Sequence, residues 1–134
     1  MSRRRVVVTG LGVISPVGNT VTEAWSNLIA GKSGIGPITR FDASNFASRI
    51  AGEVKDFDVS AYLSPKEARR MDVFIHYGMA AGIQAIRDSG IEVTDANADR
   101  IGINIGSGIG GLPMIEETHN DFLGGSPRKI SPFF

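Results

Sequence analysis

The feature that most constrains the fold is the stretch at residues 100–112, which reads RIGINIGSGIGGL. Isoleucines at its start alternate with glycine or asparagine, and a period of two is typical of a strand. Residues 106–111 are mostly glycine, which lets a backbone turn sharply and pass close to other atoms. Residues 113–123 then begin with a proline and suit a helix. The sequence therefore predicts strand, glycine turn and helix, an arrangement at which open α/β folds bind ligands.

Composition excludes several classes of protein. The chain has 134 residues, enough for one domain, and its formal net charge is zero, so no overall field favours nucleic acid. It holds no cysteine, which excludes a disulfide, a thiolate metal ligand and a cysteine nucleophile within these residues. The apolar run after Arg5 is too short for a signal peptide, and none approaches the roughly 20 residues of a membrane helix. We expect a cytoplasmic protein that binds neither nucleic acid nor a membrane.

Residues 20–30 are predicted to form the clearest helix. Thr20 and Glu23 have the spacing of a capping box, in which each side chain accepts a hydrogen bond from the other residue's backbone. Apolar residues, Trp25 among them, recur at helical spacing along one side. We therefore expect Trp25 to be buried.

Two more helices are predicted in the middle of the chain. Ser64 and Glu67 repeat the capping-box spacing, with a proline between them at the first helical position. The helix at residues 72–89 is apolar nearly all round, which predicts a buried helix. Small residues on it would let another backbone pack closely: Gly78, Gly82 and Ala85.

Two further strands are predicted. Residues 5–10 contain three consecutive valines, a pattern typical of a strand covered on both faces. Residues 48–54 are expected to form a short strand at a sheet edge, and the remainder of residues 32–57 is expected to be irregular.

Basic residues form two clusters. Lys66, Arg69 and Arg70 share one helix face, and Arg128 and Lys129 form a second pair. Cations in a first helical turn face the positive end of the helix dipole, so helix stability does not explain the first cluster. On a chain of zero net charge, two basic patches favour an acidic partner, although a solvated face explains the same residues.

Other functions have weaker support. Residues 106–111 fit the G-x-G-x-x-G pattern, so a small dinucleotide-binding domain is one alternative, but the acidic residue expected about 20 residues later is missing. Glu116 and His119 could share a helix face, yet no third ligand is evident and we expect no metal site. His76, on an apolar helix, is expected to be a hydrogen-bonded core or boundary residue.

Four segments together resemble a known family. Residues 5–19, 69–78, 105–111 and 127–134 read RVVVTGLGVISPVGN, RRMDVFIHYG, IGSGIGG and PRKISPFF, in that order. They are similar to the β-ketoacyl-[acyl-carrier-protein] synthases, particularly type II of bacterial fatty-acid synthesis. The resemblance implies an α/β, thiolase-like fold with α-β-α-β-α layers and a mixed sheet flanked by helices, in a homodimer.

The resemblance also implies an activity and its limits. Members of the family condense an acyl primer with malonyl-[acyl-carrier protein] and release CO₂, using a cysteine nucleophile and two histidines. The chain has no cysteine, and His76 and His119 do not match the catalytic histidines. Residues 1–134 are thus expected to be the incomplete N-terminal portion of the family's N-terminal domain, without a catalytic residue or a cofactor. We expect the chain alone to be inactive.

Site residues follow from the same resemblance. Ile109 matches the residue that gates the acyl pocket, and Phe134 matches an aromatic residue that lines the partner subunit's pocket. The basic residues match those that dock acyl carrier protein with its phosphopantetheine-linked acyl and malonyl groups: Lys66, Arg69, Arg70, Arg128 and Lys129. A non-catalytic module that binds carrier protein is the second alternative.

Overall fold

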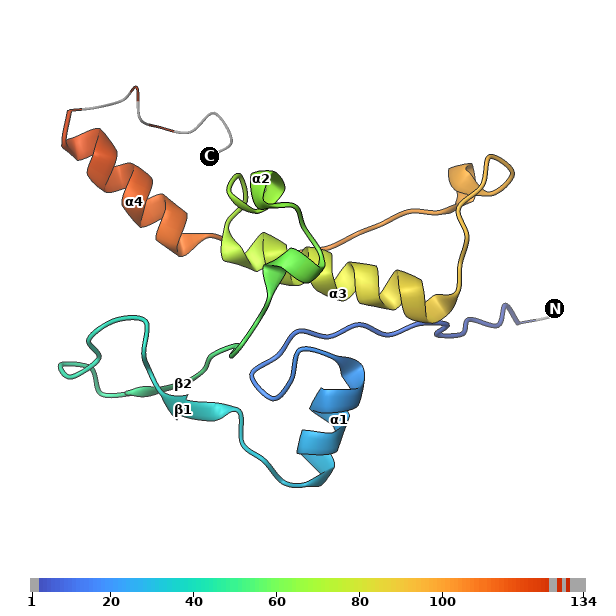
Figure 1. The fold of residues 1–134 in the computed structure, drawn as a ribbon, viewed down its shortest axis with the longest axis horizontal. Coiled ribbons are helices and arrows are strands. Elements are labelled where there is room, and N and C mark those ends of the chain that lie inside the picture. Colours follow the sequence, from blue (N-terminus) through green and yellow to red (C-terminus); the bar gives the residue numbers. More distant parts are fainter. Residues whose placement is uncertain (1–2, 126–127, 129, 131–134) are drawn as a thin grey trace. The chain divides into compact units, whose positions relative to one another are not determined.

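The computed structural model describes residues 3–125, 128 and 130, and it divides into two compact units. Unit 1 comprises Met1–Asp58 and Ala80–Glu92, and unit 2 comprises Val59–Met79 and Val93–Phe134. The elements, drawn in Figure 1, follow in this order: α1 (Val21–Ile29), β1 (Ile35–Pro37), β2 (Ile50–Gly52), the 3₁₀ turn η1 (Val59–Ala61), α2 (Pro65–Ala68), α3 (Val73–Ser89), the 3₁₀ turn η2 (Ala98–Arg100) and α4 (Leu112–Leu123).

Helix α1 begins as the sequence predicts. The Oγ1 of Thr20 accepts a hydrogen bond from the amide of Glu23 at 3.2 Å, and the Glu23 carboxylate accepts one from the amide of Asn19 at 2.7 Å. Ala24 is buried, but Trp25 is 64% exposed, so the expectation that Trp25 is buried is wrong. Amphipathic spacing identifies the apolar side of a helix but does not supply the layer that covers it.

A single hairpin forms the sheet of the described residues. β1 pairs antiparallel with β2, with Gly36 opposite Ala51. The short strand expected within residues 48–54 is confirmed, whereas β1 lies in the stretch expected to be irregular. Just beyond the strands, the Glu53 carboxylate accepts hydrogen bonds from the amide and the hydroxyl of Thr39, at 3.1 and 2.7 Å.

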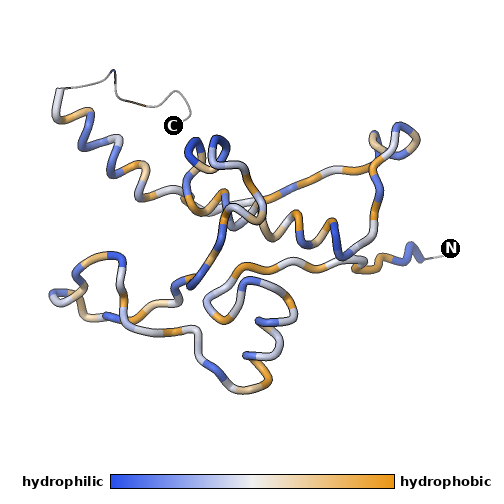
Figure 2. Tube along the Cα trace, in the orientation of Figure 1, coloured by the Kyte–Doolittle hydropathy of each residue, from blue (hydrophilic) through white to orange (hydrophobic). Residues whose placement is uncertain are grey.

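Two predicted strands are extended but unpaired. Within residues 3–125, 128 and 130, neither residues 5–10 nor residues 101–106 belong to a sheet, and Val6 is 94% exposed. Figure 2 shows the apolar residues along both segments. A strand needs a neighbouring backbone to satisfy its N–H and C=O groups, and a local pattern of side chains cannot provide one.

In unit 1, the end of the first extended segment packs tightly on α3. A Cβ atom added at Gly10 or Gly12 would collide with the carbonyl oxygen of Ala85 or Ala81, respectively. The amide of Leu11 donates a hydrogen bond to the Asp88 carboxylate at 2.8 Å, and the amide of Val13 donates one to Oε1 of Gln84 at 3.2 Å. Of the predicted stripe, Ala85 therefore admits a close backbone; the second close contact is at Ala81, which was not predicted, and Gly78 meets only the side chain of Ile105.

Helix α3 is less buried than its composition suggests. Ala80 is fully buried, but most other side chains of α3 are half-buried or exposed, so the expectation of a buried helix is wrong for most of its length. Few apolar residues are buried among those described: Ala24, Ala43, Leu63 and Ala80. No helix in the described part of the chain has the length and hydrophobicity needed to cross a membrane.

Candidate functional site

The glycine turn lies in unit 2 and ends against the start of α3. Gly110 has a φ of +83°, and a Cβ atom there would lie 2.9 Å from Cζ of Phe74. A Cβ atom at Gly111 would collide with the Asp72 carboxylate and would lie 2.7 Å from its Cγ atom. Glycine is thus needed at position 110 for its backbone conformation and at position 111 for the close approach of Asp72.

Asp72 connects the N-termini of two helices. Its Oδ1 accepts a hydrogen bond from the amide of Val73 at the start of α3, and its Oδ2 accepts one from the amide of Met114 in the first turn of α4, at 3.2 Å. A negative charge at a helix N-terminus is favourable because of the helix dipole. This role of Asp72 was not predicted from the sequence. An aspartate directly before an apolar helical run is a capping signal, but nothing in the sequence indicates a bond to Met114, 42 residues away.

The start of α4 does not suit a dinucleotide. A pyrophosphate bound there would need free N–H groups and a site without negative charge. Leu112 and Ile115 donate to carbonyls within the turn, Pro113 has no N–H, and Met114 donates to Asp72. Every amide of this first turn is used and a carboxylate is already in place, so the geometry opposes the dinucleotide alternative.

Ile109 is the bulky side chain of the glycine turn. It is 78% exposed, so the described residues do not enclose it in a pocket. Phe134, its expected counterpart across the dimer, lies outside the described residues, as does Lys129.

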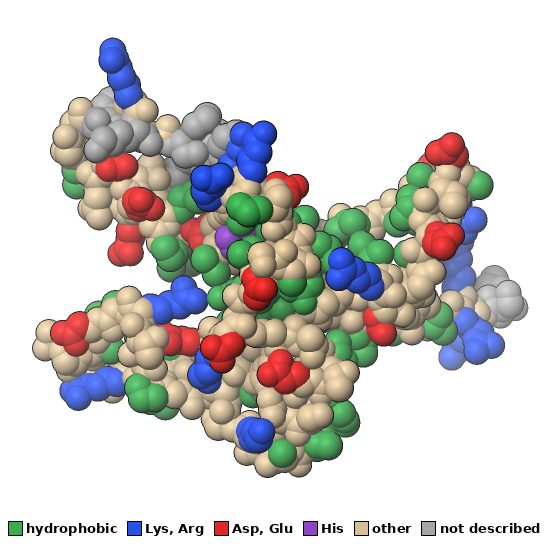
Figure 3. Space-filling view, in the orientation of Figure 1, with side chains coloured by type: hydrophobic (Ala, Val, Ile, Leu, Met, Phe, Trp, Pro, Cys, Tyr) green, Lys and Arg blue, Asp and Glu red, His purple; other side chains and the backbone are tan. Residues whose placement is uncertain are grey.

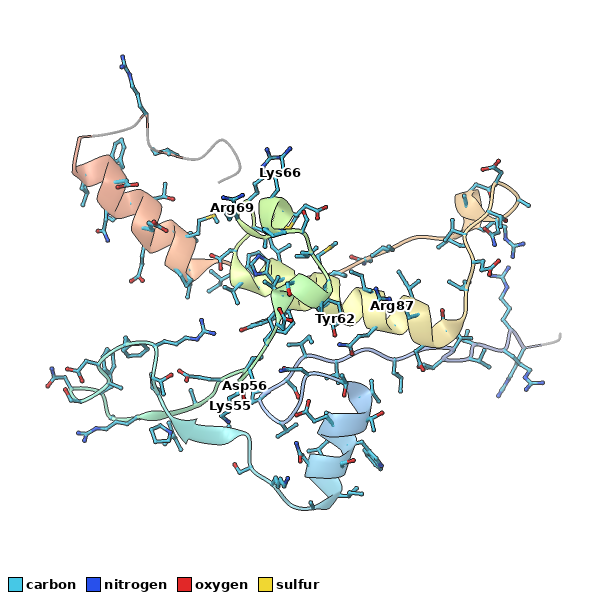
Figure 4. The ribbon with its side chains drawn as sticks, viewed as in Figure 1. Lys55, Asp56, Tyr62, Lys66, Arg69 and Arg87 are labelled. Atoms are coloured by element: carbon cyan, nitrogen blue, oxygen red, sulfur yellow. The ribbon has the colours of Figure 1, made fainter. Side chains whose placement is uncertain are left out.

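The first basic cluster is exposed on and just after α2. Lys66 lies on the helix and Arg69 and Arg70 directly follow it, and all three are exposed. Lys66 and Arg69 are labelled in Figure 4, and Figure 3 shows basic side chains gathered over α2. The Nε of Arg69 donates to the carbonyl of Pro65 at 3.1 Å. Arg128, of the second cluster, is also exposed.

A complete capping box fixes the start of α2. The Oγ of Ser64 accepts from the amide of Glu67 at 3.3 Å, and the Glu67 carboxylate accepts from the amide and the hydroxyl of Ser64 at 3.0 and 2.6 Å. The Ser64 hydroxyl and then its backbone amide lower the pKa of Glu67. Glu67 therefore stays ionised, and its negative charge is favourable at the helix N-terminus. Helix α2 ends at Ala68 with Arg69 as its C-cap, so Arg69 and Arg70 lie at the end where the dipole favours cations, and the expectation that they oppose the dipole is wrong.

His76 joins α2 to α3. Its Nε2 lies 2.9 Å from the carbonyl oxygen of Ala68, the last residue of α2, and the side chain is half-buried. The expectation of a hydrogen-bonded boundary histidine is thus confirmed. Among the described residues there is no group of three His, Asp or Glu side chains that could hold a metal ion.

Comparisons with known proteins agree along the whole chain. Residues 3–134 match the family described as "Beta-ketoacyl synthase, N-terminal domain". The chain is 60% identical to 3-oxoacyl-[acyl-carrier-protein] synthase 2 of Vibrio harveyi over 134 residues, which are 100% of this chain and 32% of that protein. The same enzyme of Coxiella burnetii is 55% identical over 134 residues, again 32% of its length.

Solved structures show the same fold. The ishigamide ketosynthase/chain length factor matches 98% of this chain and 33% of its own, with a TM-score of 0.77 and 33% identity. A ketosynthase in complex with a type II PKS acyl-carrier protein matches with a TM-score of 0.77 and 31% identity over 98% of this chain and 35% of its own. The α/β, thiolase-like class of fold is therefore correct.

The chain spans about a third of the length of the curated relatives that it matches. Its family, however, is settled by a match from residue 3 to residue 134 and by identities of more than half to relatives that share one name. The chain belongs to the β-ketoacyl synthase family.

Proposed function

We propose that the chain is the N-terminal portion of a 3-oxoacyl-[acyl-carrier-protein] synthase II, which acts as a cytoplasmic homodimer in fatty-acid biosynthesis. The observation that carries the proposal is the 60% identity over all 134 residues to the Vibrio harveyi enzyme of that name. In the proposed reaction a carbon–carbon bond forms between the acyl carbonyl carbon and malonyl C2, the acyl thioester bond breaks, and CO₂ leaves the malonyl group.

A chimera tests the activity. Residues 1–134 would replace the matching 32% of the Vibrio harveyi enzyme, and the product formed from acyl- and malonyl-carrier protein would be measured. We expect β-ketoacyl product from the chimera and none from the 134-residue chain alone, which contains no cysteine. An inactive but folded chimera would contradict the proposal. Product from the chain alone would contradict its assignment as a portion without catalytic residues.

The basic residues are proposed to dock the carrier protein. Lys66, Arg69, Arg70 and Arg128 are exposed, and a structural neighbour is a ketosynthase bound to an acyl-carrier protein. Arg69→Glu combined with Arg70→Glu should weaken carrier binding to the chimera at least about tenfold, because an acidic partner would meet repulsion in place of attraction. The matched control is Lys32→Glu combined with Arg87→Glu, which reverses two exposed charges within unit 1. Equal binding by the two variants would contradict docking at α2.

Ile109 is proposed to gate the acyl pocket, with Phe134 of the partner subunit as its neighbour. Ile109→Phe in the chimera should shorten the products, because a larger side chain at the gate leaves less room for the acyl chain. Leu123→Phe enlarges an exposed residue at the far end of α4 and should leave the product lengths unchanged. An unchanged profile in Ile109→Phe would contradict the gate.

A non-catalytic module for carrier binding is the second candidate. The absence of cysteine from these residues favours it over an enzyme complete within this chain. Under this alternative the Arg69 and Arg70 variants would still lose carrier binding, but the chimera would yield no β-ketoacyl product. Product formation therefore separates the two candidates.

A further inference from the structure

We infer that Asp72 is a positioning residue for the turn that carries Ile109, and through it for the length of acyl chain that the enzyme accepts. The inference deepens the proposed gate and depends on the proposed function only for its chain-length readout. Its structural readouts, amide exchange and mutational coupling, do not depend on that function.

The second half of the glycine turn has close neighbours, whereas the first half does not. Cβ atoms added at Gly106 or Gly108 would meet nothing within 4 Å. At Gly110 and Gly111, by contrast, the ring of Phe74 and the carboxylate of Asp72 lie against the backbone. Ile109 stands at the boundary between these two parts.

Of the two neighbours, Asp72 makes the directional contacts. Its two oxygens accept from one amide in α3 and one in α4, so a single side chain sets the spacing between the helix starts that flank the turn. An asparagine has the same shape but only one acceptor oxygen, and its NH₂ group would face one of the two N–H groups. Asp72→Asn therefore loses one bond with little change in volume.

Gly111 offers an independent test of the contact. Its φ is −69°, which alanine adopts without strain, so the obstruction to a Cβ atom there is the Asp72 side chain, from its carboxylate to its Cβ atom. Gly111→Ala should displace the carboxylate and free the Met114 amide. In a background of Asp72→Gly, which removes the Cβ atom 2.9 Å away as well as the carboxylate, the same substitution should have little further effect. This non-additivity is the mark of direct contact.

The experiment uses the chimeric synthase with each variant. For Asp72→Asn we expect at least about tenfold faster hydrogen exchange at the amide of Val73 or of Met114, whichever then faces the NH₂ group, and this corresponds to about 1.4 kcal/mol of lost protection. Since the gate is then less firmly held, we also expect a broader product profile extending to longer chains. Asp88→Asn is the matched control, because Asp88 also accepts from a backbone amide, that of Leu11, but lies in unit 1. It should change neither readout.

Each outcome decides the matter. Unchanged exchange at both the Val73 and the Met114 amides in Asp72→Asn would overturn the positioning role, whatever the activity. Faster exchange with unchanged product lengths would overturn the link to chain length. If Ile109→Phe also left the lengths unchanged, the proposed gate itself would have failed. If Asp72→Asn gave no soluble protein, Gly111→Ala would replace it, and additive effects of Gly111→Ala and Asp72→Gly would overturn the inference.

Discussion

Two extended, glycine-containing segments contact α3, and they are held there by different chemistry. In unit 1, Gly10 and Gly12 rest on carbonyl oxygens of α3, and two neighbouring amides donate to α3 side chains. In unit 2, Gly110 and Gly111 rest on the side chains of Phe74 and Asp72.

The two contacts differ in whether the atoms next to the glycines can move aside. Helix backbone is fixed by its own hydrogen bonds, so a collision with a carbonyl of α3 cannot be relieved by a change of rotamer. A phenyl ring or a carboxylate can rotate away, at the cost of its contacts. The first segment is therefore clamped, whereas the turn with Ile109 is held by groups that are able to move.

The largest expected effect is at Gly12. Gly12→Ala should destabilise the contact of residues 10–13 with α3 by about 3 kcal/mol, at the upper end of ordinary overpacking, because no side chain can move to make room. Hydrogen exchange at the amides of Leu11 and Val13 should then accelerate about a hundredfold. Gly36→Ala is the control, since a Cβ atom there meets nothing within 4 Å. Equal exchange in the two variants would remove the distinction between clamped and yielding segments.

A smaller effect is expected at Gly110. Gly110→Ala should cost about 1–2 kcal/mol, mostly from the left-handed backbone conformation, because the Phe74 ring can rotate away. The free energy is measured from exchange at the Met114 amide. Gly106→Ala adds a Cβ atom with no neighbour within 4 Å, so the free energy of opening at the Met114 amide should stay within about 0.5 kcal/mol of that of the parent. A cost at Gly110 as large as that at Gly12 would show that the ring does not yield.

The smallest effect concerns two exposed carboxylates, one in each unit. Hydrogen bonds from the Ser64 side chain and backbone lower the pKa of Glu67, and those from the Thr39 side chain and backbone do the same for Glu53. A lowered pKa stabilises the folded state above about 4.3, the ordinary value for glutamate, and this stabilisation is lost as the pH falls through the folded pKa.

Removal of each hydroxyl tests the cause by NMR titration. Ser64→Ala should raise the pKa of Glu67 toward its ordinary value and leave Glu53 unchanged, whereas Thr39→Ala should do the reverse. Each variant is thus the control for the other. A rise in both values with either substitution would indicate a general loss of structure rather than loss of one hydrogen bond.

Local signals predicted the helices well. The capping residues Thr20 and Ser64 make the expected bonds, and α3 and α4 begin within one residue of the predicted positions. These predictions succeed because a helix satisfies its backbone groups within one stretch of sequence.

Predictions that required a partner far along the chain failed or stayed open. The valines at residues 6–8 are extended but unpaired among the described residues, and Trp25 has no layer over it. At the site, motif resemblance identified Ile109 and the basic residues on and just after α2, whose roles stay predictions. The contact of Asp72 with Met114 was not predictable, because it joins residues 42 apart in sequence.

The uneven surroundings of the glycine turn bear on any attempt to redesign it. New side chains at positions 106 and 108 enter open space among the described residues, so they displace no neighbour within this part of the chain. Position 111 accepts a larger residue only if position 72 shrinks at the same time. An engineer should therefore randomise the first half of the turn alone and treat positions 72 and 111 as one joint choice.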